Sequence, residues 1–420
     1  MKKTLVAAAA AAVAVPLAVV AAPATHAAPP ASPASVLSWN ATAVSTVLAS
    51  GQFQAQGMTH LAYVQAAVYD AVVAVAGHGR PYVGHLHSSS PASLDAAVAT
   101  SAYDILAAQY PGQVAVYGPA YVASLAAVAD GAEKTQGIAI GHQAAADVVA
   151  ARAGDGLEAS VPYTFGSGPG AWVLPTDNPS TTPQTPWVGA MRPFLVHSAN
   201  AYLPGRQPRL GSARYAADFN ETKDFGSKTS SVRTADETLV ARFWSANINT
   251  VYNATARSVA TGHDMDATQT ARLLALTDLV GADSLIACMD AKYHYSAWRP
   301  FTAIRNADTD GNPATTADPT WTPLLLTPNH PEYPAAHGCI TAAEGEVLAA
   351  VLDTRHIGID VTSPVTATTR HFDTVADLES EVVDARVWGG LHFRTSVEVG
   401  MRIGRDVAWD ALDQFPGDPR

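Results

Sequence analysis

Three short segments in the second half of the chain carry basic residues and histidines at spacings that could serve one reaction centre. Lys292 and Arg299 are seven residues apart, and a proline follows directly. Seven residues are two helical turns, so we expect both cations to project from one helix face, with the proline ending or kinking that helix. His337 stands in a second segment, and Arg386 and His392 stand in a third.

These residue types suit the binding of a tetrahedral oxyanion and chemistry at its centre. Arginine neutralises anion oxygens through its planar fork of donors, and lysine acts as a point charge. Residues 334–338 read as the start of a helix, which adds free backbone N–H groups and places His337 in the first turn. The pair Gly389-Gly390 allows a sharp turn between Arg386 and His392, so both can reach the same centre.

Composition favours a globular protein with a large core. The chain has 420 residues, of which 48% are hydrophobic and 15% are charged, and this argues against wholesale disorder. The formal net charge of −12 and the lack of a basic face with interleaved aromatic residues predict that nucleic acid is not a partner. In so acidic a chain, a cluster of cations is informative.

The first 27 residues have the pattern of a signal peptide. A short basic start is followed by an Ala/Val-rich run over residues 4–22 and by small residues before position 28. We expect cleavage after Ala27 and a secreted protein. A permanent membrane anchor is the competing interpretation, which the shortness of the run and Pro16 within it disfavour. No later stretch is long and apolar enough to predict a stable membrane span.

The rest of the chain predicts a mainly α protein with few strands. Apolar residues recur every three or four positions in most of it, and Thr234 with Glu237 forms a capping-box pattern. Residues 154–211 are rich in Pro and Gly but also carry aromatic residues, which indicates an ordered loop over a helical body. We therefore expect an N-terminal helical region with this loop (28–212) and a C-terminal helical catalytic region with the oxyanion site (213–420). Helices are expected over residues 58–76, 93–110, 120–151, 234–259, 268–295, 337–354, 377–387 and 391–412.

Cys288 and Cys339 are the two cysteines of the chain. In an exported protein they could form a disulfide, since each lies within a few residues of a proposed site group. Two separate buried thiols are the alternative. Catalytic thiol chemistry is disfavoured, because no residue near either position is arranged to activate a thiol.

The order Lys-x6-Arg-Pro, Pro-x-x-His and Arg-x5-His resembles the vanadium-dependent haloperoxidases and the related type-2 phosphatidic acid phosphatases and bacterial acid phosphatases. The surrounding residues 290–295, 298–305 and 330–334 resemble the exported actinobacterial branch of the haloperoxidases. The resemblance implies packed helical bundles with the anion inside the C-terminal bundle. It implies that Lys292, Arg299, Arg386 and the backbone N–H of Ala336 bind the oxygens of vanadate.

The same resemblance implies roles for both histidines. His392 would be the axial ligand to vanadium, and His337 would be the acid/base that handles the protons of peroxide and hydroxide. Hydrogen peroxide, a halide and an organic acceptor would be the small-molecule substrates. Bound vanadate has the shape of a phosphoryl-transfer transition state, so phosphate could occupy the same site, with His392 as nucleophile and His337 as leaving-group acid.

Three positions depart from or qualify the family pattern, and all three concern the expected halide or substrate pocket. Ala335 and Ala336 replace the usual Ser-Gly, so the hydroxyl that would donate to an anion oxygen is missing at Ala335. Met289 stands where an aromatic residue is common, which gives a softer wall. His330 stands seven residues before the acid/base histidine, where a histidine accompanies bromide oxidation in this family.

The leading hypothesis is a haloperoxidase that oxidises halide with hydrogen peroxide and halogenates an organic acceptor. Phosphate monoester hydrolysis at the same site is an alternative. A third hypothesis is a vanadate-independent rearrangement, in which His337 and the cations act as acid/base and oxyanion stabilisers for a bound ketone or prenylated aromatic.

Overall fold

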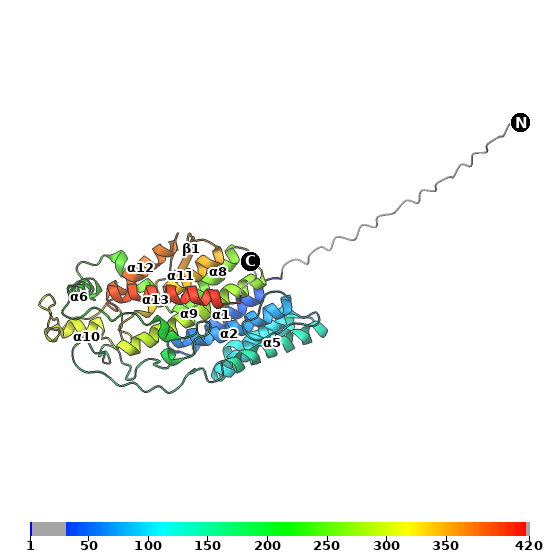
Figure 1. Ribbon diagram of the computed structural model, residues 1–420, viewed down its shortest axis with the longest axis horizontal. Coiled ribbons are helices and arrows are strands. Elements are labelled where there is room, and N and C mark those ends of the chain that lie inside the picture. The colour runs from blue at the N-terminus through cyan, green and yellow to red at the C-terminus, as the bar shows by residue number, and fades with distance from the viewer. Residues whose placement is uncertain (2–30, 417–420) are drawn as a thin grey trace. The chain divides into compact units, whose positions relative to one another are not determined.

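The computed structural model describes residue 1 and residues 31–416, and the residues from Ala31 onward form one compact unit (Figure 1). Except for its first residue, the predicted signal peptide lies outside the described residues. The proposed boundary between residues 212 and 213 stays a prediction.

The described chain is mainly helical, which confirms the predicted fold class. Its strands, Ile359–Ser363 (β1) and Thr368–Phe372 (β2), pair as one antiparallel hairpin. The α-helices are α1 Ala34–Ala49, α2 Gln54–Ala76, α3 Leu94–Gln109, α4 Val114–Ala127, α5 Ala132–Ala151, α6 Ala213–Gly226, α7 Ala235–Phe243, α8 Ile248–Gly262, α9 Ala267–Tyr295, α10 Pro300–Arg305, α11 Ala336–Leu352, α12 Val375–Trp388 and α13 Arg394–Gln414.

Helix α9 lies at the centre of this unit, and it contacts α1, α2, α8, α11 and α13. Figure 1 shows α1, α2 and α5 on one side of it and α8, α11 and α12 on the other. Helix α2 is long and apolar enough to cross a membrane, but 94% of its apolar window is buried inside the protein. Its apolar surface therefore belongs to the core, where α2 packs on α9 and α3.

The expectation that Lys292 and Arg299 share one helix face is wrong. Helix α9 ends just after Lys292, because Ser296 adopts a left-handed conformation (φ 48°) and its N–H closes the last turn on the Lys292 carbonyl. The chain then extends, with the N–H of Trp298 donating to Gly170. Arg299 is the residue before α10, which Pro300 begins rather than ends.

Glycines bring α11 and α13 into backbone contact next to the predicted site. A Cβ on Gly400 would overlap the carbonyl oxygen of Ala335, and one on Gly404 would overlap that of Cys339. The N–H of Ala335 donates to the Ser396 carbonyl across the same interface. This close approach fixes the start of α11 against the start of α13.

A disulfide joins Cys288 of α9 to Cys339 of α11. The structure thereby decides between the two alternatives that the sequence left open. The bond closes a loop with a sequence separation of 51 residues, which in the chain-entropy model stabilises the fold by about 4 kcal/mol. It holds the start of α11 close to the helix that carries Lys292.

The loop over residues 154–211 is ordered on the helical body, as its aromatic residues indicated. It contains 3₁₀ turns at Val188–Ala190 and Ala199–Tyr202. The buried carboxylate of Asp283 in α9 accepts the backbone N–H groups of Phe194, Leu195 and Val196 at 2.5, 2.7 and 2.9 Å. These bonds fix the loop to α9 and place other loop residues at the edge of the site.

Candidate functional site

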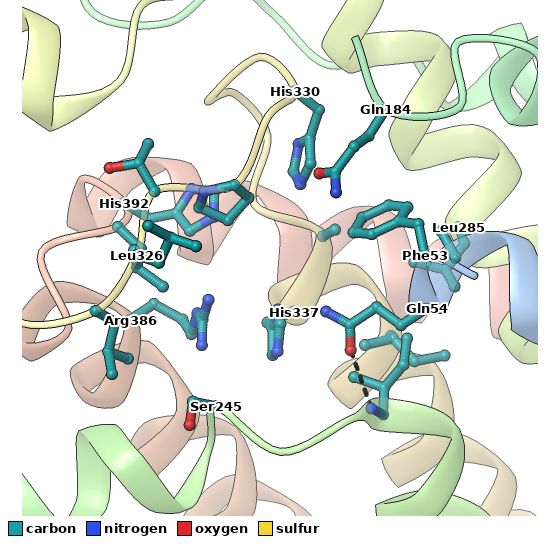
Figure 2. Close-up of a pocket in the computed structure, with 18 of the residues that line it drawn as sticks. Phe53, Gln54, Gln184, Ser245, Leu285, Leu326, His330, His337, Arg386 and His392 are labelled. Atoms are coloured by element: carbon teal, nitrogen blue, oxygen red, sulfur yellow. Dashed lines mark hydrogen bonds between the residues drawn. The ribbon is translucent and has the colours of Figure 1, made fainter. Parts of the chain in front are cut away.

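A cavity of about 380 Å³ lies between the C-terminal helices, the start of α2 and the long loop. Figure 2 shows the side chains that face it. Its polar lining comprises Gln54, Asn178, Gln184, Ser245, Thr327, His330, His337, Arg386 and His392. Its apolar lining comprises Phe53, Ala55, Ile248, Leu285, Leu325, Leu326, Pro328, Ala336, Ile340 and Leu391.

The hydrogen bonds of His392 fix its tautomer. Arg299 Nη1 lies 3.1 Å from His392 Nε2, and a guanidinium can only donate, so Nε2 is the acceptor. The other ring nitrogen, Nδ1, then carries the hydrogen and donates to Glu332 Oε1 at 2.9 Å. Burial, followed by the charges of Arg299 and Lys292, holds the pKa of His392 well below its ordinary value. His392 is therefore a neutral imidazole with a lone pair on Nε2.

Arg299 is fully buried and supports both histidines rather than lining the cavity. Its Nε donates to the His330 carbonyl at 2.8 Å and its Nη1 to the Leu391 carbonyl at 3.0 Å. Its Nη2 lies 3.0 Å from His330 Nδ1. Burial lowers the pKa of Arg299 to about 10, so the side chain stays cationic at neutral pH.

Lys292 is also fully buried and lies outside the cavity lining. Its Nζ donates to the carbonyls of Pro331 and Glu332 at 3.0 Å each. Burial and the nearby Arg299 lower the pKa of Lys292 well below its ordinary value. Lys292 thus fixes the loop that carries His330, and its charge acts from behind the cavity wall.

Arg386 and His337 face the cavity with hydrogen-bonding capacity to spare. Arg386 Nη1 donates to the Trp244 carbonyl at 3.0 Å, whereas its buried Nε has no partner among the described residues. The buried His337 Nε2 also has no partner there. Burial and the charge of Arg386 hold the pKa of His337 well below its ordinary value, so this imidazole is neutral.

The start of α11 adds backbone donors to the same cavity. Ala336 lines it, and the N–H groups of Ala336 and His337 have no acceptor in the described chain. Ala335 and Met289 are fully buried outside the lining, and Leu285, one helical turn before Met289, lines the cavity instead.

The predicted residues on the lining are thus His330, Ala336, His337, Arg386 and His392, with Lys292 and Arg299 directly behind them. The structure brings all three predicted segments to one place. The individual roles that the resemblance implies stay predictions.

Glu332 belongs to this site although the sequence did not single it out as functional. Its buried carboxylate accepts from His392 Nδ1 and, at 3.1 Å, from the Phe393 N–H. Burial raises its pKa to about 7, against the opposing charges of Lys292 and Arg299. The signal that could have found it is its place two residues after His330 and five before His337.

The donor set fits an oxyanion. Arg386, the free N–H groups at the start of α11 and His337 can all donate to anion oxygens, and His392 Nε2 carries a lone pair that accepts from Arg299 in this structure. Among the described residues, no group of three or more His, Cys, Asp or Glu side chains could hold a bare metal ion. Vanadate is a metal oxyanion whose oxygens need hydrogen-bond donors and whose metal takes one nitrogen ligand, and these groups match it.

Comparisons with known proteins agree with this fold. The family model described as the VCPO second helical-bundle domain matches residues 272–416. Among curated proteins, none matches the sequence. The chain shares the fold of bacterial vanadium haloperoxidases, and residues 272–416 match the model of their second helical-bundle domain.

The solved structures that it resembles span nearly the whole chain. A structure described as the first bacterial vanadium-dependent iodoperoxidase has a TM-score of 0.78 and 21% identity, and the match covers 92% of this chain and 98% of that one. A holo-type bacterial vanadium-dependent chloroperoxidase has a TM-score of 0.71 and 17% identity, with 85% and 90% covered. An apo-type bacterial vanadium-dependent chloroperoxidase gives 0.70 and 18%, with 85% and 92% covered.

Proposed function

We propose that this protein is a vanadium-dependent haloperoxidase that oxidises halide with hydrogen peroxide and halogenates an organic acceptor. One observation carries the proposal. Three buried basic side chains lie at a cavity onto which the His392 ring and unpartnered donors converge, and Glu332 interacts with two of the three. Such an excess of buried positive charge is costly unless an anion occupies the cavity.

The residues that would hold vanadate follow from this geometry. Arg386 and the N–H groups of Ala336 and His337 would bind its oxygens. His392 Nε2 would be the ligand to the metal, in place of the hydrogen bond that it now accepts from Arg299. Lys292 and Arg299 would add positive charge from behind the wall. Bound vanadate would supply Lewis-acid activation of peroxide.

His337 is the group that would move protons. It is neutral and its Nε2 is free, so this nitrogen can accept a proton from incoming peroxide and return it to departing water. Glu332 acts through His392: by accepting from Nδ1 it keeps the Nε2 lone pair directed away from the carboxylate.

The test is metal analysis of the purified protein after vanadate soaking and desalting, together with a bromide-plus-peroxide assay on a phenol dye. Retained vanadium and dye bromination that needs vanadate, peroxide and bromide are expected. Release of nitrophenol from nitrophenyl phosphate without peroxide, inhibited by vanadate, would instead establish the phosphatase. A ketone rearrangement that survives strict vanadium depletion would establish the third hypothesis.

We also propose that the protein is exported. The support is the signal-peptide pattern of residues 1–27 and the Cys288–Cys339 bond, since structural disulfides persist in oxidising compartments. Expression of the full chain in a secreting bacterial host, followed by intact mass of the protein in the medium, tests this. The expected mass is that of a chain that begins at Ala28. Retention of the full-length chain in the cells contradicts the proposal.

A further inference from the structure

Two glutamines from the N-terminal half of the chain face the cavity with fixed orientations. Gln54 is the first residue of α2, and its Oε1 accepts the N–H of Ile248 at 3.1 Å. Gln184 lies in the long loop, and its Oε1 accepts the N–H of Asn329 at 3.1 Å. A backbone N–H can only donate, so in both side chains the oxygen must face the backbone and the NH₂ group must face the other way.

Neither NH₂ group has an acceptor among the described residues, and both side chains line the cavity. Figure 2 shows the amide nitrogen of Gln54 directed toward His337 and that of Gln184 directed into the cavity beside Phe53. The backbone of each glutamine is also held by a hydrogen bond. Asn249 Nδ2 donates to the Gln54 carbonyl at 3.1 Å, and the backbone N–H of Gln184 donates to the Asn329 carbonyl at 2.8 Å.

The surroundings of these amides differ from those of the cations. Phe53 and Leu285 lie near them on the lining, whereas Arg386, His392 and Leu326 lie on the opposite side of the cavity (Figure 2). An anion gains more from the cationic side, so the neutral amide donors suit a neutral oxygen acceptor. A volume of about 380 Å³ exceeds what a halide and an oxyanion need, and the remaining space can hold a small organic molecule.

We propose that Gln54 and Gln184 form a subsite that binds a carbonyl oxygen of the organic acceptor. The apolar body of the acceptor packs against Phe53 and Leu285. This inference rests on the proposed haloperoxidase, for which it names the class of acceptor: an apolar, ring-bearing ketone or related carbonyl compound. Because each amide oxygen is already bonded to the backbone, the subsite donates hydrogen bonds and does not accept them.

The test is a binding measurement that needs no turnover. Isothermal titration calorimetry compares 2-acetylnaphthalene with 2-ethylnaphthalene, which has the same skeleton without the oxygen. The full mature protein is used with and without vanadate, in the absence of peroxide and halide. The wild type is expected to bind the ketone at least tenfold more tightly than the hydrocarbon, because the hydrocarbon covers the two amide donors without giving them an acceptor.

Two substitutions at each glutamine test the loss of the NH₂ donor separately from any loss of folding. Gln54→Glu and Gln184→Glu keep an oxygen for the backbone N–H but lose the donors, and Gln54→Met and Gln184→Met lose them without adding charge. Each is expected to reduce the preference for the ketone at least fivefold. Gln143→Glu, on the exposed face of α5, adds the same charge outside the cavity and should keep the full preference. Thermal unfolding of each variant checks that it is folded.

Equal binding of ketone and hydrocarbon to the wild type overturns the inference, as does a preference that survives in all the glutamine variants. Displacement of the ketone by sodium bromide in the wild type, with tighter bromide binding than in the variants, assigns the amides to halide instead and also overturns it. Dye bromination by a wild type without ketone preference leaves the proposed function standing. If the protein prefers the ketone but never brominates the dye, the subsite proposal stands and the proposed peroxidase function fails.

Discussion

Two regions of the protein bury arginine in opposite ways. Arg152, at the end of α5, is 3% exposed and forms an ion pair with the buried Asp155 at 2.5 Å. It also donates to the Pro193 carbonyl at 2.6 Å and lies 3.8 Å from the centre of the Phe194 ring. Arg386, at the site, is as deeply buried but has one carbonyl partner and an unpartnered Nε.

The difference separates a structural use of buried charge from a functional one. Around Arg152 the positive charge is neutralised within the protein, because Asp155 pairs with it directly and the Asp283 carboxylate lies close enough to interact. At the site, Lys292 and Arg299 interact with Glu332, and Arg299 also interacts with Asp177. The main charge that acts on Arg386 is the positive charge of Arg299. Deep burial therefore does not by itself mark a binding site. An uncompensated excess of charge does, because it is stable only when a ligand of opposite charge is bound.

The largest predicted effect compares the two arginines directly. Arg152→Met leaves Asp155 buried without its partner and should lower the free energy of unfolding by about 3–5 kcal/mol. Arg386→Met removes an uncompensated charge and, in oxyanion-free buffer, should change it by less than about 1 kcal/mol or stabilise the protein. Urea unfolding followed by circular dichroism measures both. Equal losses in the two variants would remove the distinction between the regions.

The next prediction concerns the two imidazoles of the site. His392→Ala removes the proposed nitrogen ligand to the metal, so the soaked and desalted protein should retain no vanadium. His337→Ala leaves that ligand in place, so it should retain some vanadium while turnover falls about 10²–10⁴-fold, the usual contribution of a general acid–base group. Elemental analysis and the bromide assay are read on the same samples. Full activity in both variants would show that the reaction occurs elsewhere.

A smaller effect is expected from the pH dependence of stability at Asp283, the carboxylate near Arg152. Burial raises the pKa of Asp283 to about 6, above its ordinary 3.8, despite three backbone donors. The folded state therefore binds this proton more tightly, and the resulting stability is present below about pH 4 and is lost as pH rises through about 6. Asp283→Asn lacks this titration. The free energy of unfolding of the wild type minus that of the variant should therefore fall by about 2 kcal/mol between pH 4 and 7. Unfolding curves at several pH values test this, and a constant difference contradicts it.

The sequence predicted helix type better than helix boundaries. The capping box of Thr234 and Glu237 starts α7 as predicted. The expected helix over 234–259 is instead two helices, because Asn247 caps a new one, α8. The expected helix over 120–151 is likewise divided, with α5 starting after Gly131. Local periodicity continues across such breaks, so it indicates helix without showing where the chain turns.

The site shows the same limit at the level of single residues. The types and spacing of His337, Arg386 and His392 are local signals, and the structure places all three on one cavity. The position of Arg299 depends on a contact between the chain after α9 and residue Gly170 of the long loop, which no local pattern reveals. Gln184 was missed for the same reason, since it reaches the cavity only because the loop lies on the C-terminal helices.

The smallest predicted effect tests whether the start of α11 contributes to folding stability or to anion binding. Ala335 occupies the N-cap of α11 with extended backbone (φ −76°, ψ 122°) and no side-chain cap, and the His337 N–H has no acceptor in the described chain. In Ala335→Ser the new hydroxyl can accept that N–H, which should stabilise the vanadate-free protein by about 1 kcal/mol. The family resemblance predicts instead that the hydroxyl donates to the anion and tightens vanadate binding. Because Ala335 lies outside the cavity lining and its new hydroxyl would compete with vanadate for the His337 N–H, we expect the gain in unfolding free energy and no tightening of vanadate binding. Tighter vanadate binding with unchanged unfolding would show that this side chain faces the anion, and the start of α11 would then belong to the functional region alone.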